Sequence, residues 1–458
     1  MTPNMRFVVM GDLHYVQEQS HQEALNGRPK GVTELADVTR NLWFTKHVTP
    51  KIISGIAALK PDFVVQTGDI IQGHCDDEAG GLREMQEAME LLEELRCPVF
   101  FALGTHDGIP GGPEGLQVER FVYPAIGKAL GTAPVSKGYY TFEKAGCLFI
   151  VLDYTTFVRN GDQEAFIKET FSSSGRYEHV FVFAHPPLFC VGRPFFTHFD
   201  FAGTVLKQIS EHPVDAYFCG HTHNQVTTLH KVGEYWLPQL KSTVLAYPDR
   251  APVHLSEVRS LLPEPSTFEY GWGYLEDSAP GWWEITVNGE SVQADWHVLN
   301  QGVLGQLTWK RGEKAVFTRR PEFAESAGQR LPNLNEMVSV RLRAAGSNCR
   351  TPEGYKVSLN GREIGTLPRL EYFDSRQFMA IGKEHWPLLT NRNRLSITTA
   401  EESMCIGGFV LEVETAAGWI RSNVTDYFAN TDRWDVWGKS PLEKIAPNQS
   451  VSVELTFG

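Results

Sequence analysis

Five short motifs in the first half of the chain hold side chains that could bind metal ions and carry out a hydrolysis. They follow one another in the order Asp12-Leu13-His14, Gly68-Asp69, Gly104-Thr105-His106-Asp107, His185 and Gly220-His221-Thr222-His223. The set offers two carboxylates and four imidazoles as ligands, with a fifth imidazole beside them. Mixed nitrogen and oxygen ligands suit Zn, Mn or Fe. The residue types therefore predict a two-metal hydrolytic centre.

The spacing within the motifs suits such a centre. Two divalent ions about 3.5–4 Å apart can generate a hydroxide near neutral pH, neutralise phosphate oxygens and orient an in-line attack on phosphorus. Asp12 and His14 can turn toward one ion from a single loop, and Asp69 can bridge two ions. His221 and His223 share one face if their segment is extended.

The elements that must position these residues follow from the apolar pattern. Each motif stands after an apolar run that is typical of a β-strand: residues 6–11, 63–67, 97–103, 180–184 and 216–219. Helical patterns over 34–59 and 83–95 alternate with these runs, and Pro50 is expected to kink or split the first of them. This alternation predicts a layered α/β domain, in which ligands bind beyond the carboxyl ends of the strands.

The second half of the chain has a different character. Helical patterns stop after residue 225, and Asn288-Gly289 and Asn360-Gly361 are strong hairpin signals. We place the domain boundary in the turn-rich stretch at 300–305, which gives an α/β domain over 1–300 and a second domain over 301–458. Short strands separated by turns predict that the second domain is an all-β sandwich.

The ordered motifs resemble the calcineurin-like metallophosphoesterase superfamily over residues 6–298. Its pattern runs Asp-x-His, Gly-Asp, Gly-Asn-His-Asp/Glu, His and Gly-His-x-His. The resemblance implies a sandwich of β-sheets flanked by helices, and the second domain resembles the jelly-roll modules attached to some phosphoesterases. The family resemblance over residues 6–298 also implies a phosphomono- or phosphodiesterase that uses a metal-bridging hydroxide as its nucleophile. One ion would be held by Asp12, His14, Asp69 and His223, and the other by Asp69, His185, His221 and the family's Asn.

The resemblance assigns roles beside the ions as well. His106 matches the histidine that stabilises the transition state or protonates the leaving oxygen, and Asp107 would orient it, because an imidazole acid works best with its second nitrogen anchored. Purple acid phosphatases of this family carry a Tyr three residues after the aspartate of Gly-Asp. Gln72 stands there in this chain, so the redox-active iron type is not expected.

Thr105 departs from the family pattern, which has Asn at this position. Its hydroxyl could coordinate an ion, a water could fill the place, or the second ion could bind weakly and impair catalysis. We favour an enzyme with a weakened second site, because the other matched positions hold the expected residue types. The alternative is a non-catalytic metal-binding or scaffold protein that retains the fold.

Several loop residues are candidates for substrate contact. His198 lies in a Pro- and Phe-rich segment over 186–200 that could cover the substrate or form a packed Ω-loop. Asp153 could support the substrate site or cap a local turn. His74, with two neighbouring aspartates, could line the mouth of the site or belong to a solvated loop.

Composition limits the function classes. The chain has 458 residues and a net charge of −13, which argues against binding of nucleic acid polymers but allows a small phosphorylated substrate next to metal ions. No apolar run approaches the ~20 residues of a membrane span, and the N-terminus has no signal-peptide pattern. Seven cysteines without a Cys-x-x-Cys pattern indicate buried thiols in a reducing, cytoplasmic compartment. The oligomeric state stays open, and the second domain could contact another subunit.

Overall fold

The computed structural model describes residues 4–26, 35–108, 115–157, 161–189, 199–223, 225–243, 268–276, 280–299, 302–319, 330–347, 354–367, 375–398, 405–416, 418–423, 425, 427–429, 443–444 and 449–457. The chain forms two compact units, and the last change from the first unit to the second falls between Thr318 and Arg319. None of the helices in the described ranges has the length and apolar character needed to cross a bilayer.

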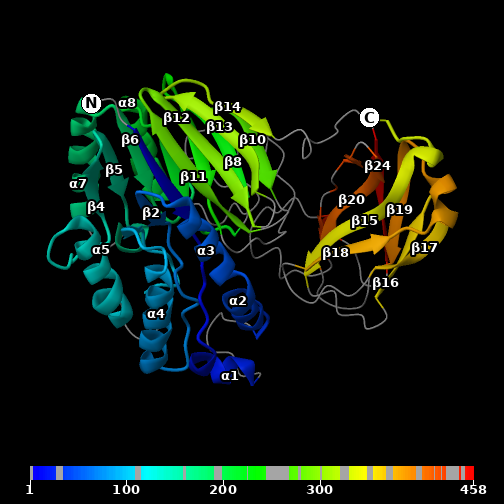
Figure 1. Ribbon diagram of the computed structural model, residues 1–458, viewed down its shortest axis with the longest axis horizontal. Helices are drawn as coiled ribbons and strands as arrows, with labels where there is room; N and C mark the ends of the chain where they lie inside the picture. Colours follow the sequence, from blue (N-terminus) through cyan, green and yellow to red (C-terminus); the bar gives the residue numbers. More distant parts are fainter. Residues whose placement is uncertain are drawn as a thin grey trace. The chain divides into compact units, whose positions relative to one another are not determined.

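Two seven-stranded sheets build the first unit (Figure 1). The spatial order of the first sheet is β14 (Val316–Arg319), β13 (Gly302–Lys310), β12 (Ser291–Val298), β11 (Gly281–Asn288), β1 (Asn4–Met10), β2 (Phe63–Gln66) and β3 (Val99–Phe101). That of the second sheet is β10 (Phe268–Glu276), β8 (Gln225–Val232), β9 (Tyr235–Lys241), β7 (Ala216–Cys219), β6 (His179–Phe183), β5 (Cys147–Val151) and β4 (Tyr140–Lys144).

Phenylalanine rings join the inner faces of the two sheets. Phe7 of β1 stacks on Phe63 of β2 at 5.0 Å between ring centroids, and its edge meets Phe149 of β5 at 5.5 Å and Phe181 of β6 at 5.3 Å. All four rings are fully buried. Side chains alternate along a strand, so the neighbours of these rings point to the outer faces of the sheets.

The described residues of the first unit also form eight α-helices. They are α1 (Gln22–Leu25), α2 (Leu35–His47), α3 (Thr49–Leu59), α4 (Glu78–Glu93), α5 (Tyr123–Leu130), α6 (Tyr154–Phe157), α7 (Gly161–Ser173) and α8 (Phe199–Glu211), with short helical turns over Glu18–His21, Val118–Val122 and Ser174–Arg176. Ile150 of β5 and Val182 of β6 share a buried cluster with Phe171 of α7 and Val205 of α8. The expected layered α/β architecture is confirmed, and Pro50 stands where the first helical pattern splits into α2 and α3.

The first unit continues past the expected boundary at residue 300. Strand β13 pairs with β12, with Val298 opposite Gly302, and β14 extends the same sheet. Gly302 has a φ of 76°. Residues 302–305 therefore belong to a strand of this sheet, and the boundary expected there moves to Thr318.

The second unit is an all-β sandwich within the described residues. One sheet has the order β18 (Ser375–Ala380), β15 (Met337–Ser347), β20 (Cys405–Thr415), β22 (Tyr427–Ala429) and β23 (Glu443–Lys444), with β21 (Gly418–Arg421) on β20. The other has the order β17 (Arg362–Leu367), β16 (Tyr355–Leu359), β19 (Arg392–Thr398) and β24 (Ser450–Thr456). Both sheets contribute to one apolar core, which includes Leu342, Leu395 and Leu411. Its described helical segments are two short turns, Leu334–Glu336 and Lys383–Leu388.

Candidate metal centre

The loops that follow five strands meet at one place in the first unit. Strands β1, β2 and β3 run parallel in one sheet, and β6 and β7 run parallel in the other. Within each sheet the loops are joined by backbone hydrogen bonds, from Asp12 N to Gly68 O at 3.0 Å and from Gly220 N to His185 O at 2.9 Å. The backbone N–H of His221 donates to Asp12 Oδ1 at 2.8 Å and so joins the loops of the two sheets.

Two glycines of the motifs leave room for this convergence. Gly68 has a φ of 102°, and a Cβ there would lie 2.6 Å from Nδ1 of His185. A Cβ on Gly104 would lie 2.2 Å from the backbone nitrogen of Asp69. A side chain at either position would displace a functional residue, which gives the Gly-Asp and Gly-Thr-His-Asp motifs a physical reason.

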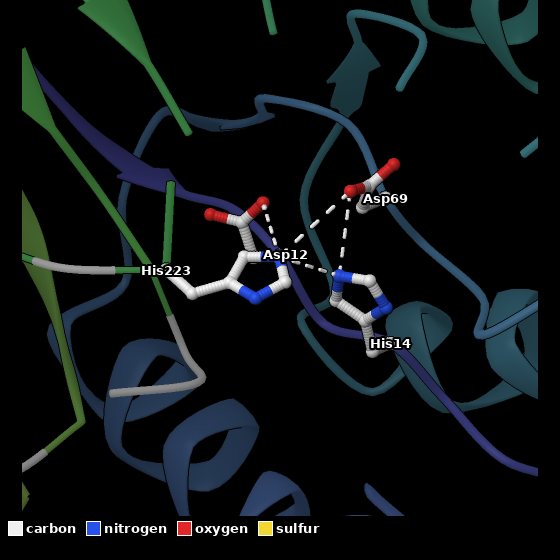
Figure 2. A group of neighbouring side chains, drawn as sticks. All are labelled: Asp12, His14, Asp69 and His223. Atoms are coloured by element: carbon white, nitrogen blue, oxygen red, sulfur yellow. Dashed lines mark hydrogen bonds and ion pairs between the residues drawn. The ribbon is translucent and has the colours of Figure 1, made fainter. Parts of the chain in front are cut away.

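Asp12, His14, Asp69 and His223 form the first ligand cluster (Figure 2). Nε2 of His14 lies 2.9 Å from Nε2 of His223 and 3.3 Å from Oδ2 of Asp69. Nε2 of His223 lies 3.8 Å from Oδ1 of Asp12. Three of the four side chains come from the first sheet and one from the second.

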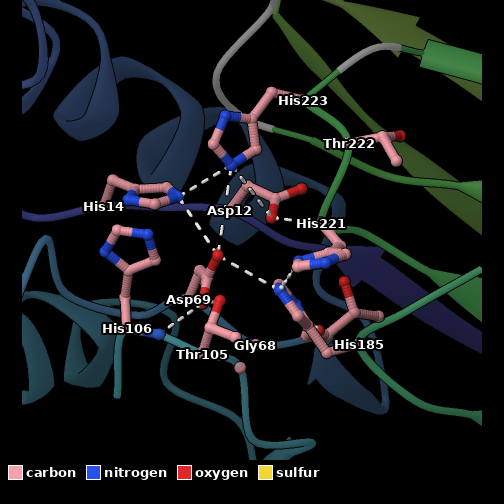
Figure 3. Close-up of polar contacts among 12 residues, drawn as sticks. Asp12, His14, Gly68, Asp69, Thr105, His106, His185, His221, Thr222 and His223 are labelled. Carbon is pink, nitrogen blue, oxygen red and sulfur yellow. Dashed lines mark hydrogen bonds and ion pairs between the residues drawn. The ribbon is translucent and has the colours of Figure 1, made fainter. Parts of the chain in front are cut away.

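Asp69, His185 and His221 form a second cluster beside the first (Figure 3). Nε2 of His185 lies 3.1 Å from Oδ2 of Asp69 and 2.9 Å from Nδ1 of His221. Oδ2 of Asp69 thus faces ligands of both clusters. The structure brings together all six side chains that the sequence assigned to metal binding, in the two groups that the family resemblance implied.

The hydrogen bonds of the ligands fit bound cations. His14 Nδ1 lies 3.1 Å from the amide oxygen of Gln72, and His185 Nδ1 donates to the carbonyl oxygen of Thr67 at 2.9 Å. In the neutral imidazoles, Nδ1 therefore carries the hydrogen, and the Nε2 lone pairs face a carboxylate oxygen. Two facing acceptors need a cation between them, either a metal ion or a proton on the imidazole. With metal–ligand bonds of roughly 2.0–2.2 Å and angles of about 90–109° between them, two ligands of one ion stand about 2.8–3.6 Å apart, and the shortest separations in both clusters fall in this range.

Burial and neighbouring charges shift the pKa values of Asp12 and Asp69 in opposite directions. Burial raises the pKa of Asp12 to about 7. Burial alone would also raise the pKa of Asp69, but the rings of His185 and His106 outweigh it and hold that pKa well below its usual range. Burial opposes protonation of His185, yet the Asp69 carboxylate raises its pKa to about 9. Asp69 is therefore the anionic residue around which the cationic groups gather.

His106 lies beside the first cluster. Its ring meets that of His14 edge to face, with 4.5 Å between centroids, and its backbone N–H donates to Oδ1 of Asp69 at 2.9 Å. Its Nδ1 donates to the backbone carbonyl of Gln72 at 2.5 Å. This bond fixes the ring and leaves Nε2 as the nitrogen that can hold a proton toward a substrate.

Asp107 does not fill the orienting role expected for it. The carboxylate is fully buried and accepts three backbone N–H groups, from Gly104 at 2.8 Å, Asp69 at 3.1 Å and Ile70 at 2.6 Å. It joins the loop after β3 to the loop after β2 and so positions Asp69. The backbone carbonyl of Gln72 takes the place at His106 Nδ1.

The remaining candidates are placed as follows. Thr105 Oγ1 lies 3.5 Å from Oδ1 of Asp69, at the edge of the centre. Asp153 is fully buried, and its carboxylate accepts hydrogen bonds from Thr155 and Thr156 at the start of α6, so it caps this turn. His198 lies outside the described residues.

Gln72 is the functional residue that sequence reasoning missed. Its side-chain oxygen lies 3.1 Å from His14 Nδ1 and accepts from Asn41 Nδ2 at 2.5 Å, while its backbone oxygen accepts from His106. One residue thus orients a metal ligand and the candidate acid. The sequence signal for this role was the position of Gln72 three residues after Asp69.

The backbone at the centre is unusual. Five ligand residues have left-handed conformations, with φ values of 50° for Asp12, 42° for His14, 53° for Asp69, 74° for His221 and 52° for His223. This conformation costs a non-glycine residue about 1–2 kcal/mol, and such strain gathers at functional sites.

Comparisons with known proteins agree with the motifs. Residues 5–225 match the model of the calcineurin-like phosphoesterase family. Similar solved structures include a dimetal phosphatase from Danio rerio, with 14% identity, coverage of 69% of this chain and 99% of that chain, and a TM-score of 0.43. They also include purple acid phosphatase PPD1 from yellow lupin, Lupinus luteus, with 15% identity, coverage of 68% and 54%, and a TM-score of 0.42. A third is GAP50, the anchor in the inner membrane complex of Plasmodium, with 14% identity, coverage of 68% and 90%, and a TM-score of 0.42. No curated protein matches the chain.

Proposed function

We propose, because residues 5–225 match the model of the calcineurin-like phosphoesterase family, that the chain is a metal-dependent phosphoesterase acting on small phosphorylated substrates. One observation carries the proposal: two ligand clusters share Asp69, with His106 beside them. The net charge of −13 disfavours a nucleic acid polymer as substrate, and the cytoplasm remains the compartment we predict.

The residues divide the work of hydrolysis. Asp12, His14, Asp69 and His223 would hold one divalent ion, and Asp69, His185 and His221 the other. Two ions there would supply a hydroxide near neutral pH and neutralise the phosphate oxygens. The Gln72 carbonyl fixes the Nδ1–H of His106, so Nε2 is the nitrogen that would carry the second proton of an imidazolium to the departing oxygen. Mn, Fe and Zn all suit this nitrogen and oxygen ligand set.

The test is hydrolysis of p-nitrophenyl phosphate and bis-p-nitrophenyl phosphate with added Mn²⁺. Wild-type protein is expected to turn over at least one of them, and His106→Ala to lower kcat by roughly 10²–10⁴-fold, as for loss of a general acid. The exposed His47 provides a matched control, and His47→Ala is expected to leave the rate unchanged. Thr105 supports the competing scaffold function. Absence of turnover of both esters would favour that scaffold, whereas turnover at an unchanged rate in His106→Ala would refute the role of His106 as the acid.

A further inference from the structure

His74 lies beside His106, the proposed acid, and its side chain has no structural role that accounts for its position. Its ring meets that of His106 edge to face, with 5.4 Å between centroids. The side chain is half-buried, and neither ring nitrogen has a hydrogen-bond partner in the described part of the chain. A half-buried imidazole with both nitrogens unused, next to the group that meets the leaving oxygen, is placed to bind a ligand.

The backbone at His74 gives a second, independent observation. The residue has a φ of 54°, directly after Gly73 at 61°. Of the ten non-glycine residues with positive φ among those described, five are the ligands named above and four end helices or form hairpin turns, namely Lys60, Arg96, Ala145 and Asn360. His74 is the tenth, and it lies in neither a helix end nor a hairpin. Glycine would adopt this conformation without strain, so the imidazole itself needs an explanation.

Backbone hydrogen bonds hold the segment that carries His74 on both sides, and the one after it runs from Asp76 N to Ser20 O at 2.8 Å. The backbone N–H of Gln72 donates to Tyr15 O at 2.9 Å, and that of Gly73 donates to Oε1 of Glu84 at 2.9 Å. Glu84 is fully buried and also binds His21 Nε2 at 2.6 Å, a hydrogen-bond distance shorter than that between two ligands of one ion. The cluster around Glu84 is therefore a clamp for this loop, and it presents the His74 ring in a fixed place.

We propose that His74 binds the leaving-group portion of the phosphoester and thereby contributes to substrate selection. This inference rests on the proposed phosphoesterase activity. The contact falls on the leaving group because the His74 ring touches His106, the group assigned to the departing oxygen, whereas the metal ligands face the phosphoryl group. Burial and the neighbouring His106 lower the pKa of His74 to about 4, so the ring is neutral near pH 7 and offers one N–H donor and one acceptor.

The experiment compares His74→Gly with wild type. Glycine keeps the left-handed backbone and removes only the imidazole, so the unfolding midpoint is expected to stay unchanged or to rise. Loss of one substrate hydrogen bond is expected to raise KM for p-nitrophenyl phosphate on the order of tenfold with a smaller change in kcat. His74→Asn, which tolerates positive φ and retains a donor, is expected to recover part of this loss.

Inorganic phosphate, used as a competitive inhibitor, locates the contact. It has no leaving group, so its inhibition constant is expected to be the same in His74→Gly and wild type. Ala145→Gly is the matched control, because Ala145 has a φ of 50° in an exposed turn, and it is expected to change neither KM nor inhibition. An unchanged KM in His74→Gly, or an equal rise in KM and in the phosphate inhibition constant, would overturn the proposal. Absence of turnover by wild type would instead refute the phosphoesterase function itself.

Discussion

At the scale of single residues, Asp69 organises the centre. Its Oδ2 faces His14 and His185 from two different clusters, and its Oδ1 accepts the backbone N–H of His106. The sequence predicted this bridging place from residue type and order. It did not predict that Asp107 would support Asp69, because the direction of that carboxylate depends on backbone turns after Gly104 that no spacing reveals.

Thr105 offers a direct test of the second cluster. An Asn amide oxygen reaches farther than a Thr hydroxyl, so Thr105→Asn is expected to add a ligand beside Asp69, His185 and His221. We expect the weaker of the two ions to bind more tightly, by on the order of tenfold. Titration of the metal-depleted protein with Mn²⁺ or Zn²⁺, followed by calorimetry, measures both affinities.

The exposed Thr132 supplies the control for this substitution, and Thr132→Asn is expected to leave both affinities as they are. Equal ion binding by Thr105→Asn and wild type would mean that position 105 contributes no ligand. A stoichiometry of one ion or none in metal-replete wild type would contradict the dinuclear centre as a whole.

At the scale of elements, the sequence predicted the strands better than the loops. Apolar runs such as 63–67 and 180–184 are long enough to mark buried strands, and both appear, as β2 and β6. The loops depend on left-handed residues such as His14 and His74, whose conformation is imposed by tertiary contacts and leaves no trace in the apolar pattern. The role of Gln72 was missed for the same reason.

His179 ties the two sheets together at the start of β6. Its Nδ1 lies 2.7 Å from Oδ1 of Asp215, and its Nε2 lies 2.6 Å from the carbonyl oxygen of Gly289 in the β11–β12 hairpin. Both partners are acceptors, so the ring bonds to both only when it is protonated. Burial alone would lower the pKa of His179, but the ion pair with Asp215 outweighs it and raises that pKa above the ordinary 6.5.

This link predicts a pH dependence of stability. Since the folded pKa is raised, the stabilisation is fully present below the ordinary pKa of 6.5 and is lost as the pH rises through the folded pKa. His179→Ala is therefore expected to lower the free energy of unfolding more at about pH 6 than at about pH 9, by on the order of 1–2 kcal/mol. Urea denaturation at the two pH values measures the difference. An equal loss of unfolding free energy at the two pH values would mean that the His179 ring is neutral. The control is His47→Ala at an exposed position, which is expected to lower the free energy of unfolding at neither pH.

At the scale of the whole molecule, the two units differ in what the sequence revealed. Alternating short strands correctly predicted an all-β second unit. The boundary was placed too early, because Gly302 and Gly305, which are typical of turns and linkers, lie inside strand β13. Only the pairing of β12 with β13 distinguishes this strand from a linker.

The corrected boundary predicts how fragments behave. A chain ending at residue 319, the last residue of β14, retains both seven-stranded sheets and is expected to stay free of aggregates and to bind metal ions. A chain ending at residue 300 lacks β13 and β14. Strand β12, which carries the buried Trp296, then becomes an exposed edge of the sheet, and we expect this fragment to aggregate. Size-exclusion chromatography and metal analysis distinguish them. Similar behaviour of the two fragments would place the boundary back at residue 300.

Both sheets contribute residues to each ligand cluster, and this arrangement links the stability of the protein to metal binding. His223 and Asp12 come from opposite sheets, as do His185 and Asp69. Each ion bound there would therefore hold the two sheets together. By mass action, a ligand that binds only the folded chain stabilises it in proportion to the logarithm of its concentration. Scarcity of metal in a cell would thus loosen the sandwich and expose it to proteases, and the amount of protein would follow the metal supply.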